Sequence, residues 1–298
     1  MKVLVLGGSG FVSGTLARRA RDAGHAVTVV TRGRRPVEAG LSAIVADRND
    51  RPAFAAAITA AGGTWDLVAD CIGFDPADAE QDLACFSGRA GHLAFISTDF
   101  VYDPARRGVP QSEEGFFCEG SDYGAQKRAC ERILEASGTK APPWTVFRPC
   151  HIYGPGSLLG CLPFHGRDPD LLARLRKGET LRLADGGSFL QQPIFVRDLA
   201  DLVLSCPGNS AATRRIFNAA GPDIVESHEY YRLIATELGV ELKIEKVSVA
   251  SCLAEQPDRT PFLCHRTYDL TRLRASGLKV PSTPLSTGLK EHVRSLLR

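Results

Sequence analysis

The residues best suited to acid–base chemistry are a phenol and an ammonium four positions apart, Tyr123 and Lys127, in the sequence Tyr-Gly-Ala-Gln-Lys. On a helix this spacing projects both side chains from the same face. A phenol ordinarily ionises at about pH 10, and a neighbouring ammonium favours the phenolate. Upstream, Thr98 follows an apolar run typical of a strand, and its hydroxyl can orient a reacting oxygen toward Tyr123. The three residues predict proton transfer during oxidation or reduction of an alcohol or ketone.

A glycine-rich turn near the N-terminus is the second group of residues with a chemical role. The sequence Gly-Gly-Ser-Gly-Phe-Val-Ser-Gly, residues 7–14, follows the apolar run Val3–Leu6 and opens a helical pattern. Gly7 permits the tight turn, and Gly10 lets the backbone approach a pyrophosphate that the helix N-terminus binds through its N–H groups. Ser13 stands where such motifs have a third glycine, and it is small enough for the helix to approach the strand. A strand before the turn and a helix after it predict a dinucleotide site.

The end of the second apolar run bears on the choice of cofactor. That run, Ala26–Val30, is followed by Thr-Arg-Gly, with Arg32 in the middle. A carboxylate at this strand end accepts the ribose hydroxyls of NAD, whereas an arginine suits the 2′-phosphate of NADP. The first carboxylate after the run is Glu38, so Arg32 favours NADP, with NAD as the alternative. Asp47, after the third run, is placed to accept a hydrogen bond from the adenine amine, unless it is only an exposed residue at a strand end.

Short apolar runs alternate with helical patterns through the first half of the chain. Runs without polar interruption are typical of parallel strands that are buried on both faces. The strands expected on this basis are Val3–Leu6, Ala26–Val30, Ala43–Ala46, Leu67–Ile72, Leu93–Ile96 and Thr145–Phe147. Between them, apolar residues at helical spacing predict helices over Gly14–Ala23, Ala53–Ala61, Ala77–Phe86 and Tyr123–Ser137. This alternation predicts an α/β fold with a doubly wound parallel sheet of the Rossmann kind.

After Pro149 the pattern changes, because glycine and proline punctuate shorter elements, as in loops around a binding cleft. The elements expected there are a strand end leading into a helix over Ile194–Cys206, a strand over Ile216–Asn218, a helix beginning at a serine cap over Ser227–Leu238, and a strand over Leu242–Val247. The sequence contains no flexible linker. We therefore expect a dinucleotide-binding domain over residues 1–150, which also uses about 190–220, and a smaller interwoven substrate lobe over 151–298.

The composition is that of an ordinary soluble globular protein. Of the 298 residues, 44% are hydrophobic and 23% are charged, and the formal net charge is +2. That charge is too small to argue for nucleic acid or a membrane surface. The nine cysteines include no Cys-x-x-Cys pair, so we interpret them as reduced residues of a cytoplasmic protein, not as disulfides or metal ligands. No apolar run reaches about eighteen residues, and the first strand begins too early for a secretory signal.

Taken together, the glycine turn, the Ser-Thr-Asp strand end and the Tyr-x-x-x-Lys helix resemble the extended short-chain dehydrogenase/reductase family, in its nucleotide-sugar epimerase/dehydratase group. The resemblance spans nearly the whole chain, through Ile96–Tyr102, Arg148–Gly156, Ile194–Ala200 and Tyr268–Gly288. It implies that Thr98, Tyr123 and Lys127 form the catalytic triad. It also implies cofactor contacts at Gly7, Gly10, Phe11, Val12, Arg32, Asp47, Ile72, Gly73 and Lys127, and substrate contacts at Asp99 and His151, although a core position is the alternative for His151.

The resemblance implies hydride transfer between a nicotinamide and a hydroxyl or ketone of a sugar-like substrate. The 4,6-dehydratases of this family usually have Thr-Asp-Glu in the catalytic strand, whereas the third position here is Phe100, which argues against dehydration. The strand is similar to that of sugar 4-ketoreductases, and a 4-epimerase stays open because it needs only the triad. The resemblance also implies a homodimer built on the helix that carries Tyr123.

The resemblance points to a nucleotide-linked sugar, but one feature of the sequence departs from that expectation. Many nucleotide-sugar enzymes carry an arginine for the substrate diphosphate just before the Ile194 landmark, and this chain has Phe-Leu-Gln-Gln-Pro there. Loss of such a charged partner weakens binding if the diphosphate is desolvated. The candidates to replace it are Arg182, Arg266 and Arg272.

A different class of function also stays open. Some plant and cyanobacterial relatives that share the Thr-Arg-Gly strand end and an Asp-x-x-Gly ending like that of residues 70–73 are RNA-binding proteins on this fold. Fold alone does not fix function. The intact Tyr123 and Lys127 pair favours the enzyme, and the basic residues near Arg32 form no long stripe.

Overall fold

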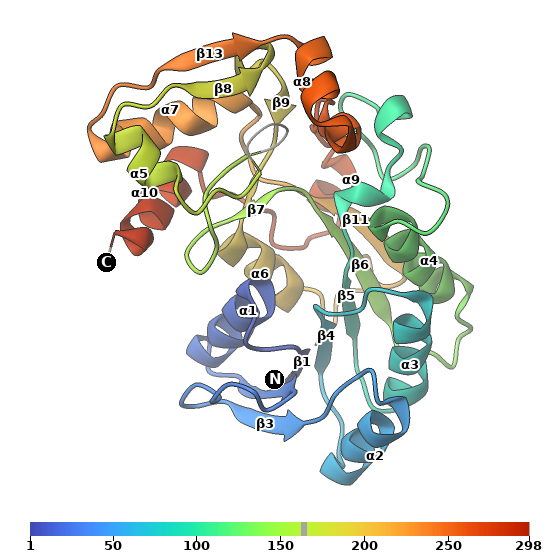
Figure 1. The fold of residues 1–298 in the computed structure, drawn as a ribbon. Coiled ribbons are helices and arrows are strands. Elements are labelled where there is room, and N and C mark those ends of the chain that lie inside the picture. The colour runs from blue at the N-terminus through green and yellow to red at the C-terminus, as the bar shows by residue number, and fades with distance from the viewer. Residues whose placement is uncertain (162–165, 298) are drawn as a thin grey trace.

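The centre of the molecule is a seven-stranded parallel sheet (Figure 1). The structure, a computed structural model, describes residues 1–161 and 166–297. The strands lie in the order β11-β6-β5-β4-β1-β2-β3. Their bounds are β1 (Lys2–Leu6), β2 (Ala26–Thr31), β3 (Ser42–Val45), β4 (Leu67–Asp70), β5 (Leu93–Ile96), β6 (Trp144–Pro149) and β11 (Arg215–Ala219). The chain reverses its direction of winding between β1 and β4, and ligands of such sheets bind outside the strand ends at this point.

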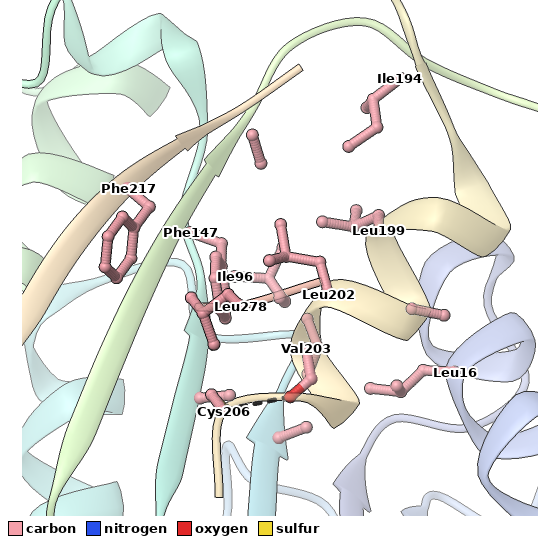
Figure 2. Close-up of a cluster of buried hydrophobic side chains, with 14 of the residues drawn as sticks. Leu16, Ile96, Phe147, Ile194, Leu199, Leu202, Val203, Cys206, Phe217 and Leu278 are labelled. Carbon is pink, nitrogen blue, oxygen red and sulfur yellow. Dashed lines mark hydrogen bonds between the residues drawn. The ribbon is translucent and has the colours of Figure 1, made fainter. Parts of the chain in front are cut away.

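Helices cover both faces of the sheet because every strand of its middle is apolar on both sides. On one face lie α1 (Phe11–Asp22) and α6 (Val196–Leu204). Figure 2 shows how Leu199, Leu202 and Val203 of α6 meet Leu16 of α1 and Phe147 of β6. On the other face lie α2 (Arg51–Ala61), α3 (Pro76–Phe86) and α4 (Tyr123–Ala136).

The C-terminal part of the chain builds a second, smaller lobe beside the carboxyl ends of the strands (Figure 1). Its helices are α5 (Leu171–Arg176), α7 (Ser227–Leu238), α8 (Val249–Glu255) and α10 (Leu285–Leu296). The short helix α9 (Thr271–Ala275) lies instead against β11 of the large sheet. Its short sheets pair β7 (Ile152–Tyr153) with β10 (Ile194–Phe195), β9 (Leu190–Gln191) with β12 (Val225–Glu226), and β8 (Leu181–Ala184) with β13 (Ile244–Val247). Between β10 and β12 the chain returns to the large sheet as α6 and β11, so the two parts are interwoven.

Within the described part of the chain, four short 3₁₀ helices complete the elements, at Asp99–Val101, Pro104–Arg106, Asp185–Gly187 and Pro257–Phe262. The smaller lobe has its own core, in which Tyr153, Tyr230 and Leu289 are buried. The doubly wound sheet and the interwoven lobe predicted from the sequence are confirmed. The domain boundary at residue 150 stays a prediction.

The predicted elements differ from the observed ones in a few local details. The first helix begins at Phe11 rather than Gly14, because the Gly14 N–H already bonds to the Gly10 carbonyl. The fourth strand ends at Asp70 rather than Ile72, where the Ile72 N–H turns to the Asp70 carboxylate at 2.8 Å. The serine cap predicted for α7 is wrong: Glu226 is the N-cap, and the Ser227 hydroxyl donates to the Phe189 carbonyl at 2.9 Å.

Throughout residues 1–161 and 166–297, we find no helix that combines the length and the apolar character needed to cross a membrane.

Candidate active site

The glycine turn between β1 and α1 is a backbone conformation that only glycine tolerates well. Gly7 and Gly8 have φ angles of 108° and 123°. A Cβ atom at Gly8 would lie 2.6 Å from Cβ of Val29 on the neighbouring strand, so the turn and β2 are in close contact. Ser13, in the position of the third glycine, is buried and accepts a hydrogen bond from the Gly10 N–H at 3.2 Å. The serine side chain therefore stabilises the turn through a hydrogen bond.

A cavity of about 390 Å³ lies against this turn, at the carboxyl ends of the strands, and we call it the glycine-loop cavity. It brings together predicted cofactor residues that are far apart in the sequence: Gly7, Gly10, Arg32, Asp47 and Ile72. Such a cavity, with a helix N-terminus at one wall, fits the phosphates and adenosine of a dinucleotide.

The lining of this cavity carries both signs of charge: Arg32 and Arg48, with Asp47, Asp75 and Asp78. Among the described residues, none forms an ion pair with Arg32, and Arg35 donates to the Ser9 carbonyl at 3.4 Å. Glu38 does not face the cavity, since Arg18 holds its carboxylate at 2.7 Å.

Asp47 lines the cavity, and one of its carboxylate oxygens accepts the Asn49 N–H at 3.0 Å.

One wall of this cavity includes part of a buried charge cluster that could not be predicted from the sequence. Arg48 pairs with Asp70 at 2.8 Å, with Asp82 at 2.9 Å and with Asp78 at 3.1 Å. Burial and the Asp70 carboxylate raise the pKa of Asp82 well above its usual value. Against the effect of burial, Arg48 keeps the pKa of Asp70 below its usual value. The cluster fixes the end of β4, where Ile72 and Gly73 follow.

A second cavity of about 390 Å³ lies between the sheet and the smaller lobe, and we call it the tyrosine pocket. It contains the three predicted catalytic residues, Thr98, Tyr123 and Lys127. Other residues that line it are Val12, Cys71, Phe74, Asp99, Phe100, Cys150, His151, Arg167 and Arg266. Phe74 lines both cavities, so they are neighbours.

Lys127 is buried, and its ammonium is tied to the ends of two strands. It donates to the carbonyl of Gly73 at 2.6 Å and to that of Ile96 at 2.5 Å. The ammonium also lies 4.2 Å from the centroid of the Phe95 ring. Burial lowers the pKa of Lys127, and the nearby Asp70 carboxylate opposes that shift. An ammonium carries three donors, and two carbonyls are its acceptors among the residues that the structure describes, which leaves one N–H for a group in the pocket.

Tyr123 begins α4, and its side chain is 48% exposed. Burial of part of the ring raises the pKa of Tyr123, and a hydrogen bond with Thr98 partly offsets that shift. Thr98 also accepts the Phe100 N–H at 3.2 Å, which fixes its orientation. The ammonium of Lys127 contacts carbonyl oxygens and not the phenol of Tyr123. It therefore does not produce the lowered pKa that the sequence predicts for Tyr123.

The adjacent Ser97 has a different role from Thr98. Its hydroxyl donates to Glu131 at 2.6 Å, and Glu131 in turn pairs with Arg148 at 2.7 Å. All three residues are buried. This pairing anchors α4, two helical turns beyond Tyr123, to β5 and β6.

Asp99 lines the tyrosine pocket, but protein groups surround its carboxylate. Arg266 donates to it at 3.0 Å and 2.5 Å, Arg107 at 3.1 Å, and the Tyr268 hydroxyl makes a short bond to the same oxygen. Although burial acts in the opposite direction, the two guanidiniums hold the pKa of Asp99 below its usual value. Asp99 is therefore a fixed negative charge that orients Arg266.

His151 lines the pocket, and its ring packs edge-on against Tyr230 at a centroid distance of 5.9 Å. Burial, with smaller contributions from Arg167 and Arg266, lowers the pKa of His151 to about 3. The imidazole is therefore neutral at physiological pH, and it can serve as a hydrogen-bonding group but not as a cation.

Two predicted cofactor residues lie at the borders of the cavities. A Cβ atom on the buried Gly73 would clash with Asp70 Oδ2, so only glycine fits where its carbonyl meets Lys127. Phe11 lies against the smaller lobe, with its ring centroid 5.6 Å from the Arg167 guanidinium.

Phe74 and Arg167 were not predicted from the sequence, and Arg266 was predicted only as one of three replacements for a missing arginine. Phe74 is 54% exposed beside Tyr123, with a ring centroid distance of 6.4 Å. The sequence signal that could have identified Phe74 is an aromatic residue directly after the Asp-x-x-Gly segment. No local pattern marks Arg167 or Arg266, because only the folding of the smaller lobe brings them to the pocket.

The residues present fit a nicotinamide dinucleotide. The turn at Gly7 and Gly8 packs so closely on Ser13 and Val29 that a Cβ atom would clash, and the cavity beside the turn leads to the tyrosine pocket past Phe74. The pocket then offers a hydroxyl pair, Thr98 and Tyr123, and the free N–H of Lys127.

Comparison with known proteins agrees with this arrangement. Residues 3–221 match the NAD dependent epimerase/dehydratase family. The chain is 28% identical over 239 residues to the chloroplast stem-loop binding protein of 41 kDa b from Arabidopsis thaliana, covering 75% of this chain but only 60% of that relative. It is 26% identical over 299 residues to a 2-alkyl-3-oxoalkanoate reductase from Stenotrophomonas maltophilia, covering 92% and 85% of the two chains.

Solved structures share the fold. The UDP-N-acetylglucosamine 4-epimerase from Methanobrevibacter ruminantium, solved in complex with UDP-N-acetylmuramic acid, superposes with a TM-score of 0.79 at 17% identity, over 99% of this chain and 98% of the other. The family match, the reductase relative and this fold together support an NAD-dependent enzyme. Because the family match covers most of the sequence, the chain belongs to the NAD dependent epimerase/dehydratase family.

Proposed function

We propose that the protein transfers a hydride between a nicotinamide cofactor and a sugar hydroxyl or ketone, with Tyr123 as the proton donor or acceptor. The observation that carries this proposal is that Phe74 lines both cavities, so that the two cavities adjoin. A dinucleotide lying along the glycine-loop cavity ends beside Thr98 and Tyr123. The chemistry that a bound nicotinamide supplies there is hydride acceptance or donation at its C4 position.

Each catalytic residue has one task in this proposal. Thr98 hydrogen-bonds the substrate oxygen and keeps it next to the Tyr123 hydroxyl. Tyr123 takes the proton from a hydroxyl being oxidised, or gives one to a ketone being reduced. Lys127, held by the Gly73 and Ile96 carbonyls, donates its remaining N–H to the nicotinamide ribose.

The glycine-loop cavity supplies the cofactor contacts. Gly7, Gly10 and the start of α1 bind the pyrophosphate, with Phe11 and Val12 beside them, and Ile72 and Gly73 line the path to the nicotinamide. Asp47 accepts from the adenine amine. We favour NADP over NAD because Arg32 lines the cavity, whereas Glu38 is paired with Arg18. A carboxylate in place of Arg32 would favour NAD.

We propose a 4-epimerase or a 4-ketoreductase rather than a dehydratase, since Phe100 offers no acid or base in the pocket. A nucleotide-linked sugar is the substrate that the epimerase-type fold supports. His151 contributes a neutral hydrogen-bonding ring. Asp99 acts on the substrate through Arg266, which it orients.

RNA binding is the less favoured alternative, and a stem-loop binding protein is among the relatives of this chain. The pocket keeps Thr98, Tyr123 and Lys127 together, an arrangement that RNA binding does not require. Retention of a labelled RNA stem-loop in a salt-dependent manner, without any cofactor binding, would favour this alternative.

We also propose that the protein is a cytoplasmic homodimer that pairs through α4. Light scattering tests the oligomeric state. Reversal of the charges of the exposed Arg132 and Glu135 on α4 tests whether this helix forms the dimer interface. A monomer at micromolar concentration would rule out the homodimer.

The proposed activity is tested by titration with NADH and NADPH, followed by a ligand panel. Pure protein is titrated with each cofactor while nicotinamide fluorescence is recorded, and the cofactor complex is then screened with nucleotide sugars for thermal stabilisation. Compounds that stabilise it are incubated and analysed by chromatography, because an epimerase consumes no net cofactor. We expect binding of at least one cofactor and conversion of at least one compound. Absence of binding to both cofactors would contradict the proposal.

A further inference from the structure

A buried arginine in the wall of the glycine-loop cavity binds two carboxylates from different segments. Arg48 lies in the loop after β3, Asp70 ends β4, and Asp78 belongs to the first turn of α3. The Arg48 guanidinium donates to Asp70 at 2.8 Å and lies 3.1 Å from a carboxylate oxygen of Asp78. All three residues are at most 6% exposed. Because a guanidinium is planar and its donors point in fixed directions, Arg48 holds the two carboxylates in a set geometry.

Both carboxylates also bind the backbone of the segment that follows β4. The second oxygen of Asp70 accepts the Ile72 N–H at 2.8 Å, and the second oxygen of Asp78 accepts the Phe74 N–H at 2.7 Å. Each carboxylate therefore uses one oxygen for Arg48 and the other for this segment, residues 72–74. Ile72 lines the glycine-loop cavity and Phe74 lines both cavities, so the segment lies where the cavities adjoin.

Gly73, between these two residues, binds the ammonium of Lys127. Its carbonyl oxygen lies 2.6 Å from the ammonium nitrogen, and a Cβ atom on it would clash with Asp70 Oδ2. The Asp70 carboxylate thus both bonds to Ile72 and packs against Gly73. Gly73 is one of the two residues whose carbonyls accept from Lys127 in the part of the chain that the structure describes. The position of the ammonium therefore depends on Asp70 and, through Asp70, on Arg48.

We infer that Arg48 is a positioning residue for the proposed reaction: through Asp70 and Asp78 it holds residues 72–74, whose central carbonyl places the Lys127 ammonium toward the nicotinamide half of the cofactor. This inference rests on the proposed function and adds a connection within it. The arginine that lines the glycine-loop cavity also fixes the lysine at the reacting end. Such support matters because a displacement of about 1 Å in a catalytic site can lower the rate about a hundredfold.

The test compares two probes that share the adenosine half of the cofactor. NADPH carries the nicotinamide riboside, and 2′-phospho-ADP lacks it; NADH and ADP replace them if only NADH binds. Calorimetry measures the dissociation constant of each probe, and their ratio reports the nicotinamide half because effects on the adenosine half cancel. We expect the wild type to bind NADPH about tenfold or more tightly than 2′-phospho-ADP, since Lys127 donates to the additional ribose.

Two variants disturb the cluster. Arg48→Lys keeps the positive charge, but a single nitrogen cannot hold both carboxylates in the geometry of a guanidinium. Asp78→Asn is nearly isosteric and has one acceptor oxygen, so either Arg48 or the Phe74 N–H loses its partner. Each variant should lower the preference for NADPH over 2′-phospho-ADP about fivefold or more. Asp78→Asn carries the test if Arg48→Lys does not fold.

Asp82→Asn is the matched control. Asp82 is buried and accepts from Arg48 at 2.9 Å, and the substitution keeps an acceptor oxygen for that bond. The N–H groups of Ile72 and Phe74 are bonded to the other two carboxylates. Urea denaturation measures the stability that this variant loses. Its preference for NADPH should nevertheless stay within about twofold of the wild-type value.

A double variant tests whether the effect passes through the lysine. Lys127→Met removes the ammonium, so the addition of Arg48→Lys or Asp78→Asn should lower the preference for NADPH by less than about twofold more. A further loss as large as that of the single variant would show that the cluster acts by another route, and it would overturn the inference.

Three other results would also overturn the inference: an unchanged preference in both single variants, an equal loss in Asp82→Asn, or a wild type that binds NADPH no more tightly than 2′-phospho-ADP. Each of them leaves the proposed function standing if the wild type binds cofactor and converts a compound. A wild-type protein that binds neither NADPH nor NADH refutes the proposed function itself.

Discussion

The ammonium of Lys127 lies 2.6 Å from the carbonyl oxygen of Gly73, a residue 54 positions earlier in the chain. The contact joins the first turn of α4 to the segment that follows β4, where the two cavities meet. Gly73 cannot carry a Cβ atom without a clash with Asp70 Oδ2, so the carbonyl has one position. The lysine thus helps to build the site as well as to supply charge to it.

Replacement of Lys127 should therefore affect both cofactor binding and turnover. In Lys127→Met, the apolar side chain still packs on Phe95, but two carbonyl oxygens lose their donor. We expect turnover to fall about a hundredfold or more, and NADPH to bind about tenfold more weakly. Steady-state kinetics and fluorescence titration measure the two effects. A variant with unchanged affinity for cofactor would show that the lysine does not contact it.

The choice between NADP and NAD is tested at the end of β2. Arg32→Gln removes a guanidinium from the glycine-loop cavity, so the affinity for NADPH should fall about tenfold while that for NADH stays the same. The neighbouring Arg34→Gln is the matched control, since Arg34 is exposed and does not line the cavity. Equal losses for both cofactors in Arg32→Gln would remove the proposed preference.

The close contact between the glycine turn and β2 leads to a prediction about stability. In Gly8→Ala, the new methyl group would lie 2.6 Å from Cβ of Val29 at a φ angle of 123°, so either the turn or β2 must move. We expect the free energy of unfolding to fall by about 3 kcal/mol. Gly24→Ala is the control: its φ is 80°, nothing lies within 4 Å, and the loss should be about 1 kcal/mol. Urea denaturation compares the two, and equal losses would argue against a close-packed turn.

A buried histidine makes stability depend on pH. His92 is 1% exposed, and burial lowers its pKa from 6.5 to about 4. Because Thr145 donates to the Ala212 carbonyl, its oxygen accepts the Nε2 proton of His92 at 2.7 Å, so the neutral ring is already satisfied.

The unfolded chain binds a proton at higher pH than the folded one does. The contribution of His92 to stability is therefore complete above about pH 6.5 and is lost as the pH falls toward about 4. His92→Gln keeps a donor for Thr145 but does not titrate. Between about pH 7.5 and about pH 4.5, the wild-type protein should lose about 2 to 3 kcal/mol more of its free energy of unfolding than this variant. Parallel losses would exclude His92 as a source of acid sensitivity.

Much of the fold could be predicted from the sequence because its signals are local. The unbroken apolar strands follow from burial on both sheet faces, and the turn at Gly7 follows from the φ angles it needs. The pairing of Thr98 with Tyr123 in one pocket could be inferred from the resemblance to a known family. Membership of that family is confirmed by the match over residues 3–221.

The parts that could not be predicted depend on contacts between distant segments. Asp99 and Arg266 are 167 positions apart, and only their meeting turns the aspartate into a support for the arginine. The cluster around Arg48 likewise joins a loop to α3. The role of Ser227 was mistaken because its hydroxyl finds a carbonyl on another segment, so it does not cap its own helix. The sequence carries no periodic signal for such pairings.

The most direct measurement is a comparison of wild-type protein with Tyr123→Phe in cofactor titration and in product formation with the first compound that the wild type converts. The variant loses one hydroxyl at a half-exposed position, so its fold and its affinity for cofactor should stay within a few-fold of wild type. If Tyr123 moves the substrate proton, product formation should fall about a hundredfold or more. Product formation at the wild-type rate would contradict a role for this tyrosine in proton transfer.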